Sequence, residues 1–224
     1  MERYIFEIDD ALPRDFCEDV ISRFECDERK KIGETVAGVN EKIKKSLDLA
    51  IVLFPEEWEA VIYKCGSCVN SMIDKYKEYL TENALDRNAS ITKTINEVVI
   101  GPPQIQKTER GGFYTWHHDS HLNRVFTYIL YLNDVEEGIG GTTEFLCGKT
   151  IQPKAGKLVI FPATLTYIHR GTKLKEGTKY IMTNFIYYQE PLLEHPRAPT
   201  PQVKENPTLI SLESVTKKPE NDDI

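Results

Sequence analysis

Two histidines and one aspartate are the residues in this chain with the clearest capacity for chemistry. His117 and Asp119 form a His-x-Asp pair, and His169 follows later in the chain. Side chains alternate along a β-strand, so His117 and Asp119 point to one side, and a neighbouring strand can bring His169 to the same place. Two imidazoles and one carboxylate on one face of a metal leave the opposite positions open, as non-haem Fe(II) requires. We predict that these three residues are metal ligands at a catalytic centre.

Other candidate ligands are weaker. His118 faces away by the same alternation, His121 lies past the pair where the chain turns, and His195 lies in a proline-rich tail. Cys65 and Cys68 form a CxxC that could be a redox pair or half of a zinc site. No second CxxC exists and the pair lies inside a helical pattern, so we interpret the two as a core thiol and its neighbour.

The first half of the chain is predicted to be mainly helical. A short alternating strand at residues 4–8 precedes an amphipathic helix after Pro13, and a longer helix runs from Pro55 to Leu80. Residues 26–45 are charged, lack periodicity and are predicted to form a loop.

From Asn96 the pattern changes to short strands, and many such strands indicate a sandwich or barrel. The runs are 97–100, 104–107, 124–133, 157–161, 166–169 and 179–188. We predict an α+β fold in one domain over residues 1–190, with helical support (1–95) and a β-core (96–190). Residues 191–224 are proline-rich and should be extended or disordered.

Composition limits the partners. The 224 residues carry 28 basic and 35 acidic side chains, a net charge of -7, which argues against nucleic acid as a partner. No stretch reaches the length of a membrane span, and the five cysteines suit reduced thiols. These features favour a cytoplasmic protein without a membrane partner. The oligomeric state is left open.

The residues around the proposed ligands match the sequence pattern of a known family. The matching residues are Gly111-Gly112, Arg124, Tyr131-Leu132-Asn133, Gly140-Gly141-Thr142-Thr143, Pro153-Lys154-Ala155-Gly156-Lys157 and Lys179. With them the chain resembles the prolyl 4-hydroxylase branch of the 2-oxoglutarate and Fe(II)-dependent oxygenases, densely over residues 97–190. The resemblance implies a double-stranded β-helix, or jelly-roll, core. It also implies Fe(II), 2-oxoglutarate and dioxygen, with ascorbate as a possible reductant.

The resemblance assigns further residues to the co-substrate. Lys179 matches the basic residue that anchors the distal carboxylate of 2-oxoglutarate, and a dicarboxylate in a poorly hydrated barrel needs such a cation. Tyr131 and Thr143 match positions that hydrogen-bond the same carboxylate, and Thr183 shares the strand face of Lys179. Two departures affect this contact set: Thr108 stands where relatives often have tyrosine, and Phe185 where they often have tryptophan.

On the substrate side, Tyr114 and Trp116 flank the His-x-Asp pair, and Arg124 matches an arginine of the peptide groove in relatives. Aromatic rings with one arginine suit an extended, proline-bearing peptide. Residues 26–48 and the acidic turn 133–138 are candidates to cover it.

The predicted function is therefore hydroxylation of a peptidyl proline, with release of succinate and CO2. The same chemistry on another side chain, a free amino acid or another small molecule is an alternative. A non-catalytic module that holds a metal for structure is a third.

Overall fold

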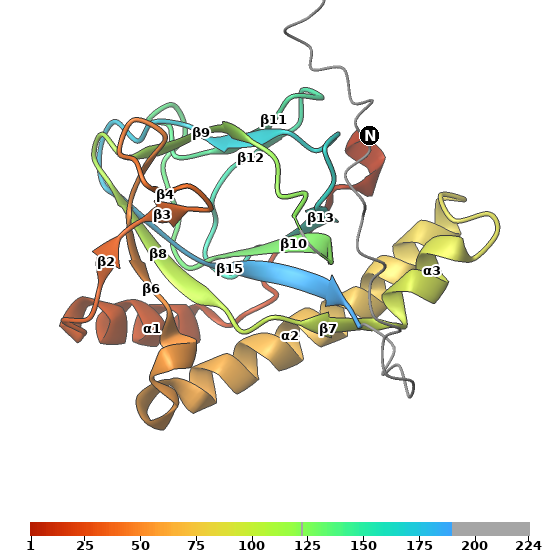
Figure 1. Ribbon diagram of the computed structural model, residues 1–224, viewed down its shortest axis with the longest axis horizontal. Helices are drawn as coiled ribbons and strands as arrows, with labels where there is room; N and C mark the ends of the chain where they lie inside the picture. The colour runs from red at the N-terminus through yellow and green to blue at the C-terminus, as the bar shows by residue number, and fades with distance from the viewer. Residues whose placement is uncertain (122, 190–224) are drawn as a thin grey trace, which may run out of the picture. The chain divides into compact units, whose positions relative to one another are not determined.

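The largest element of the structure is an eight-stranded sheet, and a computed structural model describes residues 1–121 and 123–189. Its strands are β1 (Phe6–Ile8), β2 (Lys31–Ile32), β6 (Leu47–Leu49), β7 (Val98–Ile100), β8 (Gln104–Glu109), β10 (Arg124–Tyr131), β13 (Leu158–Pro162) and β15 (Thr178–Tyr188). The order is β1-β13-β10-β15-β8-β6-β2, with β7 also paired to β15. Figure 1 shows β8, β10 and β15 crossing the middle of the molecule.

A smaller sheet holds five strands, and a hairpin stands apart from both sheets. The strands of the smaller sheet are β5 (Lys44–Lys45), β9 (Phe113–His117), β11 (Thr143–Phe145), β12 (Thr150–Ile151) and β14 (His169–Gly171). Their order is β12-β11-β14-β9-β5. The hairpin consists of β3 (Glu34–Thr35) and β4 (Gly38–Val39). The pairings are antiparallel, and the two sheets form the predicted jelly-roll core within an α+β fold.

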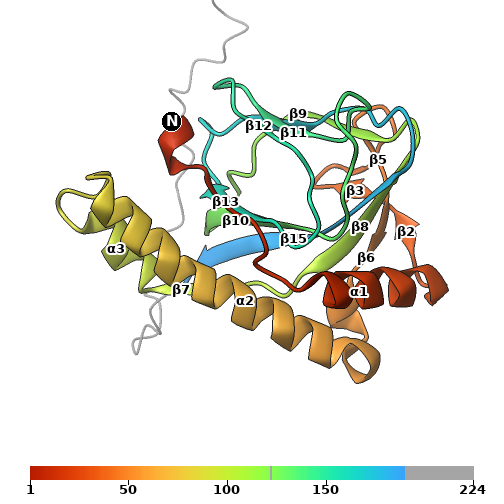
Figure 2. The ribbon, with the colours of Figure 1, turned by 180° about the vertical axis from the view of Figure 1, so that it is seen from behind.

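Helices cover one face of the large sheet. They are α1 (Arg14–Cys26), α2 (Pro55–Glu82) and α3 (Ser90–Ile95), with short 3-10 turns at Glu2–Tyr4 and Ile51–Leu53. Proline suits the first position of α2 because the first helical N–H groups have no intrahelical partner. Apolar residues at helical spacing, from Trp58 to Leu80, form its buried stripe. Both views place α1 and α2 along the same side of β8 and β7 (Figure 1, Figure 2).

Strand β10 shows how the core is divided between the two faces. Phe126, Tyr128 and Leu130 join the apolar cluster that contains the buried stripes of α1 and α2. Ile129 and Tyr131 point the other way, into a second cluster with residues of β11 and β13. Because side chains alternate, one strand serves both the helical face and the space between the sheets.

The prediction that residues 26–45 form a loop is wrong. This segment contains β2, β3, β4 and β5; β2 pairs with β6 in the large sheet and β5 pairs with β9 in the small one. These strands are two residues long, with side chains too polar to produce an apolar alternation, so their pairing depends on partners distant in the chain. The predicted tail 191–224 lies outside the described residues. None of the described helices is long and apolar enough to cross a bilayer.

Candidate active site

The structure brings the three predicted ligands together between the sheets. His117 ends β9, His169 begins the adjacent strand β14, and the two are register partners. Asp119 follows β9, and one potential ligand atom from each of the three residues lies within 4.8 Å of the others. The Nε2 atoms of His117 and His169 lie 3.8 and 3.6 Å from the carboxylate oxygens of Asp119. This close grouping of two nitrogens and a carboxylate is what a metal centre needs.

Backbone carbonyls orient both imidazoles. His117 Nδ1 lies 2.8 Å from the carbonyl oxygen of Thr115, and His169 Nδ1 lies 3.0 Å from that of Tyr167. A carbonyl can only accept, so each Nδ1 carries the proton and each Nε2 presents a lone pair to the centre. Burial, together with the nearby His169, lowers the pKa of His117 to about 4, which keeps its imidazole in the neutral, metal-binding form.

The carboxylate of Asp119 is held from the opposite sheet. Thr127 lies on β10 of the large sheet, and its hydroxyl donates a hydrogen bond of 2.6 Å to Asp119 Oδ2. Both residues are buried. The bond fixes the carboxylate and leaves Oδ1 free, so Thr127 is a positioning residue that sequence reasoning missed.

A β-bulge decides where Tyr114 points. Between the pairs His169↔His117 and Gly171↔Tyr114, β9 uses one residue more than β14. The extra residue changes the alternation. The ring of Tyr114 therefore stacks on the imidazole of His117, with centroids 3.6 Å apart, and lines the cavity. Strict alternation would have placed it on the outer face.

Trp116 lies on the other side of β9. It is 41% exposed, packs under the guanidinium of Arg170, and does not line the cavity. The guanidinium of Arg170 is itself paired with Glu144. The structure therefore does not bring Trp116 to the predicted substrate position.

Lys179 supplies a cation at the far end of the cavity. Its side chain is 5% exposed, and its ammonium donates to the carbonyl oxygen of Gly141 at 2.8 Å. Within the described part of the chain it has no carboxylate partner, and burial lowers its pKa to about 8. A buried cation without a countercharge is costly, so an anionic group bound at this end of the cavity would be stabilised.

The predicted neighbours of Lys179 lie at different depths. The hydroxyl of Tyr131 donates to Thr143 Oγ1 at 2.7 Å, so the Thr143 proton can be donated to a ligand. Thr143 and Thr183 line the cavity, whereas Tyr131 is fully buried behind Thr143. The Thr183 hydroxyl already donates to the carbonyl of Tyr128. Thr108, the first departure from the family pattern, is the register partner of Lys179 and lines the cavity.

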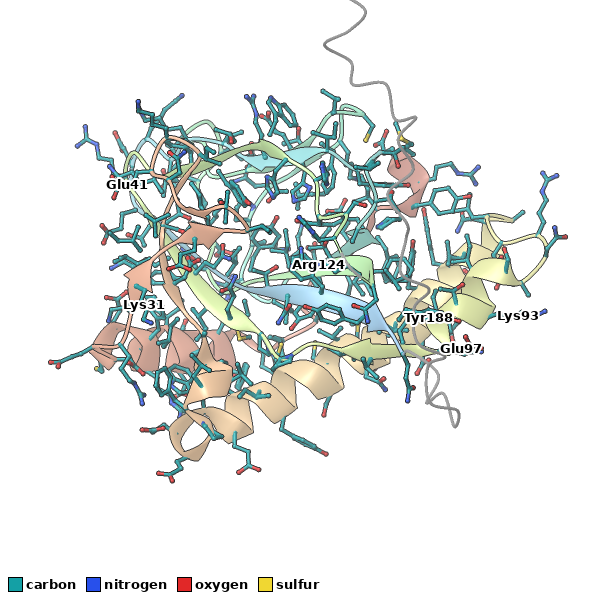
Figure 3. The ribbon with its side chains drawn as sticks, viewed as in Figure 1. Lys31, Glu41, Lys93, Glu97, Arg124 and Tyr188 are labelled. Carbon is teal, nitrogen blue, oxygen red and sulfur yellow. The ribbon has the colours of Figure 1, made fainter. Side chains whose placement is uncertain are left out.

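Arg124 stands on the side of the metal centre away from Lys179. Its guanidinium stacks on the ring of Phe185 at 3.6 Å, and its Nη1 lies 3.4 Å from the backbone oxygen of Asp119. The buried Nε atom has no hydrogen-bond partner in the part of the chain that the structure describes. Figure 3 shows Arg124 beside β10 and β15, on the side away from α2. Phe185, which stands where relatives often have tryptophan, therefore still provides an aromatic ring on which the guanidinium stacks.

Several lining residues escaped sequence reasoning. The cavity has a volume of about 290 Å³ and is closed on one side by the β3–β4 hairpin and by Lys44. Lys44 is 3% exposed and forms a 2.5 Å ion pair with Asp48. Gln104 and Gln106 of β8 also face the cavity. Of the expectations from the sequence, only the one that residues 26–48 cover the site predicted that the β3–β4 hairpin and Lys44 would line the cavity.

The sequence is similar to known oxygenases over its second half. Residues 103–187 match the 2OG-Fe(II) oxygenase superfamily. Over 96 residues, 41% of this chain, the sequence is 35% identical to human procollagen-lysine,2-oxoglutarate 5-dioxygenase 2. The matched stretch is 12% of the length of that relative.

Solved structures extend the similarity to the fold. A prolyl hydroxylase from Trichoplax adhaerens, in complex with a hypoxia inducible factor peptide fragment, aligns over 84% of each chain with a TM-score of 0.66 and 16% identity. The viral collagen prolyl hydroxylase of Paramecium bursaria Chlorella virus-1 aligns over 84% of this chain and 97% of its own, with a TM-score of 0.55 and 22% identity. At these identities the likeness is one of fold.

The superfamily implies Fe(II), 2-oxoglutarate and dioxygen, and the residues present fit them. Neutral imidazole nitrogens and a carboxylate suit Fe(II), and the buried Lys179 ammonium suits the distal carboxylate of 2-oxoglutarate. Residues 103–187 therefore match the 2OG-Fe(II) oxygenase superfamily in sequence and in the donor set of the site, on a fold shared with prolyl hydroxylases.

Proposed function

We propose that the protein is a 2-oxoglutarate-dependent dioxygenase that hydroxylates a prolyl residue of a peptide or protein. One observation carries the proposal: a single cavity holds the His117, Asp119 and His169 group and, at its far end, a buried lysine with no carboxylate partner among the described residues. When bound, iron with dioxygen and 2-oxoglutarate supplies the oxidation, because conversion of 2-oxoglutarate to succinate and CO2 provides two electrons and the second oxygen atom enters the substrate.

The protein contributes orientation. His117 and His169 present Nε2 because backbone carbonyls hold their Nδ1 protons, and Thr127 fixes the carboxylate of Asp119. Lys179 and the Thr143 hydroxyl would hold the distal carboxylate of the co-substrate in a site that excludes water. Arg124 and Tyr114 are not assigned to the metal or the co-substrate and would position the substrate.

The charge of the cavity supports proline over lysine. Its charged lining residues are Lys44, Arg124, Arg170 and Lys179 against Glu34 and Asp119. Lys44 is neutralised by Asp48 and Arg170 by Glu144, whereas Lys179 and Asp119 are assigned to co-substrate and metal. The half-buried Arg124 is the charge left for the substrate, because Glu34 is exposed. A lysine side chain would bring a second cation beside it, while a neutral proline ring would not.

A matched peptide panel tests the proposal. Purified protein with Fe(II), 2-oxoglutarate and ascorbate is offered peptides that differ only in proline or lysine at one position, together with free proline and free lysine. We expect one added oxygen on proline peptides by mass spectrometry, with equimolar succinate. Oxygen added only to lysine or to a free amino acid would overturn the substrate assignment, and metal binding without any succinate release would favour a structural module.

Variants connect this activity to the site. Asp119→Ala should reduce succinate release to background because it removes one of three proposed ligands. Asp74→Ala is the matched control, since Asp74 is exposed on α2 and forms a surface ion pair with Lys77. Equal activity of both variants with wild type would exclude this centre.

Location and further partners are also proposed. All five cysteines are free thiols, which supports a reducing compartment such as the cytoplasm. The net charge of -7 disfavours nucleic acid as substrate. Ascorbate is proposed as the reductant that maintains Fe(II), and omitting it should shorten the linear phase of succinate release.

A further inference from the structure

Strand β8 presents a row of polar side chains that the proposed chemistry does not use. Gln104, Gln106 and Thr108 line the cavity, whereas Ile105 of the same strand is packed in the cluster facing the helices. Within residues 1–121 and 123–189, neither glutamine side chain has a hydrogen-bond partner. Each amide therefore offers one acceptor and two donors to a ligand.

The row lies beside the path of the co-substrate. Across the sheet, Lys179, Ile181 and Thr183 of β15 are the register partners of Thr108, Gln106 and Gln104. On the other side, Gln106 is the register partner of Asp48 on β6. The glutamines thus lie between the strand that carries Lys179 and the ion pair of the buried Lys44 with Asp48, next to the β3–β4 hairpin.

The chemistry of this row indicates a neutral polar ligand. The two charges next to it, on Lys44 and Asp48, already neutralise each other. A carboxylate would find a better partner in Lys179, and a cation would find no free carboxylate here. Peptide groups are complementary to primary amides because each side offers donors and acceptors.

The spacing of the glutamines matches an extended peptide. Residues two apart on a strand are separated by about 6.6 Å. Peptide groups two residues apart in a polyproline II segment are separated by about 6.2 Å along the helix axis, and their carbonyls are turned by about 120° from each other, an offset within the reach of the flexible glutamine side chains. Proline lacks an N–H, so its carbonyl oxygens would accept from the glutamine NH2 groups.

We propose that Gln104 and Gln106 bind two main-chain carbonyls of the peptide substrate, which lies along β8 between the co-substrate path and the β3–β4 hairpin. This inference rests on the proposed function and adds the direction and backbone recognition of the peptide. The two residues would thereby select peptides over single amino acids.

The test compares a long and a minimal substrate. Gln104→Met, Gln106→Met and the double variant keep side-chain length but remove the amide; Gln189→Met, at an exposed glutamine outside the cavity, is the matched control. The measurements are KM and kcat with capped decaproline and with N-acetylproline amide, KM for 2-oxoglutarate, and binding of decaproline by calorimetry without oxygen.

We expect each single variant to raise KM and Kd for decaproline about threefold to tenfold, as loss of one hydrogen bond predicts. KM for N-acetylproline amide and for 2-oxoglutarate should stay unchanged, as should all constants of Gln189→Met. Thermal unfolding of each variant checks that the fold is intact.

Three results would overturn the inference. Unchanged decaproline constants in a wild type that hydroxylates proline would reject the glutamines and leave the proposed function standing. A rise in KM for 2-oxoglutarate would assign them to the co-substrate instead. If wild type neither binds nor hydroxylates decaproline, the backbone site is rejected, and the peptide panel decides the proposed function separately.

Discussion

The two faces of the large sheet are built for different purposes. The outer face packs against α1 and α2 through one apolar cluster, to which β10 contributes Phe126, Tyr128 and Leu130. The inner face has an apolar cluster toward β11 and β12, and the rest is a cavity lined by polar groups such as Lys179 and Gln106. The outer face thus supplies stability, and that stability allows the inner face to keep a buried cation that has no countercharge among the described residues.

Removing the cation should have the largest effect. Lys179→Met should weaken 2-oxoglutarate binding by about 3–5 kcal/mol, because the distal carboxylate would be buried without a partner. At the same time the unliganded variant should be more stable than wild type at pH 7, by on the order of 2 kcal/mol, since the cost of burying the ammonium is removed. Calorimetry of 2-oxoglutarate binding and urea unfolding check the two parts. A loss of both stability and binding would contradict the comparison.

The same residue sets a pH dependence. The pKa of Lys179 is lowered to about 8, so the unliganded lysine loses its proton as pH rises through 8. Binding of the dicarboxylate then requires proton uptake, and KM for 2-oxoglutarate should rise above that pH. Lys179→Arg provides the control, because a guanidinium stays charged and should remove this dependence.

A substitution on the outer face should do the opposite. Leu130 is fully buried against the helices, and Leu130→Ala should lower the free energy of unfolding by about 2–5 kcal/mol through lost burial and a cavity. KM for 2-oxoglutarate in the remaining folded protein should be unchanged at low temperature. An altered KM would show that the two faces are not independent.

A smaller effect is expected at the residue that joins the two sheets. Thr127→Val removes the hydrogen bond to Asp119 Oδ2 and keeps the shape of the side chain. We expect metal affinity to fall about tenfold to a hundredfold, as for other residues that orient a ligand. Thr127→Ser should retain most of the affinity, and Fe(II) titration of the anaerobic protein separates the two. Equal affinity of the valine variant and wild type would leave Thr127 with a packing role only.

Residues with strong local patterns could be placed from the sequence. The strand-rich second half and the helix from Pro55 follow from the sequence pattern, whereas the jelly-roll arrangement of the strands followed from the family resemblance. The alternation rule brings His117 and Asp119 to one side. The position of Lys179 at the far end of the cavity was predicted from the family resemblance and not from the alternation of side chains. Its burial without a carboxylate partner is a property that only the three-dimensional arrangement shows.

Features that depend on distant pairing could not be predicted. The strands β2 to β5 carry too few residues for a periodic signal and are held by partners on β6 and β9. The bulge in β9 turns Tyr114 toward His117, whereas Trp116 lies on the outer side of the strand. The local sequence contains no pattern that predicts the extra residue of this bulge. The roles of Gln104 and Gln106 became visible only when β8 was seen between β15 and β6.

The position of β15 has a consequence for how the protein is made. This strand is the last one in the described chain, yet it lies in the middle of the large sheet, bonded to β10 and β8. Likewise β1, near the start of the chain, can pair only after its partner strand β13 has been synthesised. On the ribosome the large sheet therefore cannot close until residues 178–188 have emerged, so folding should be a late, cooperative event dominated by long-range pairing.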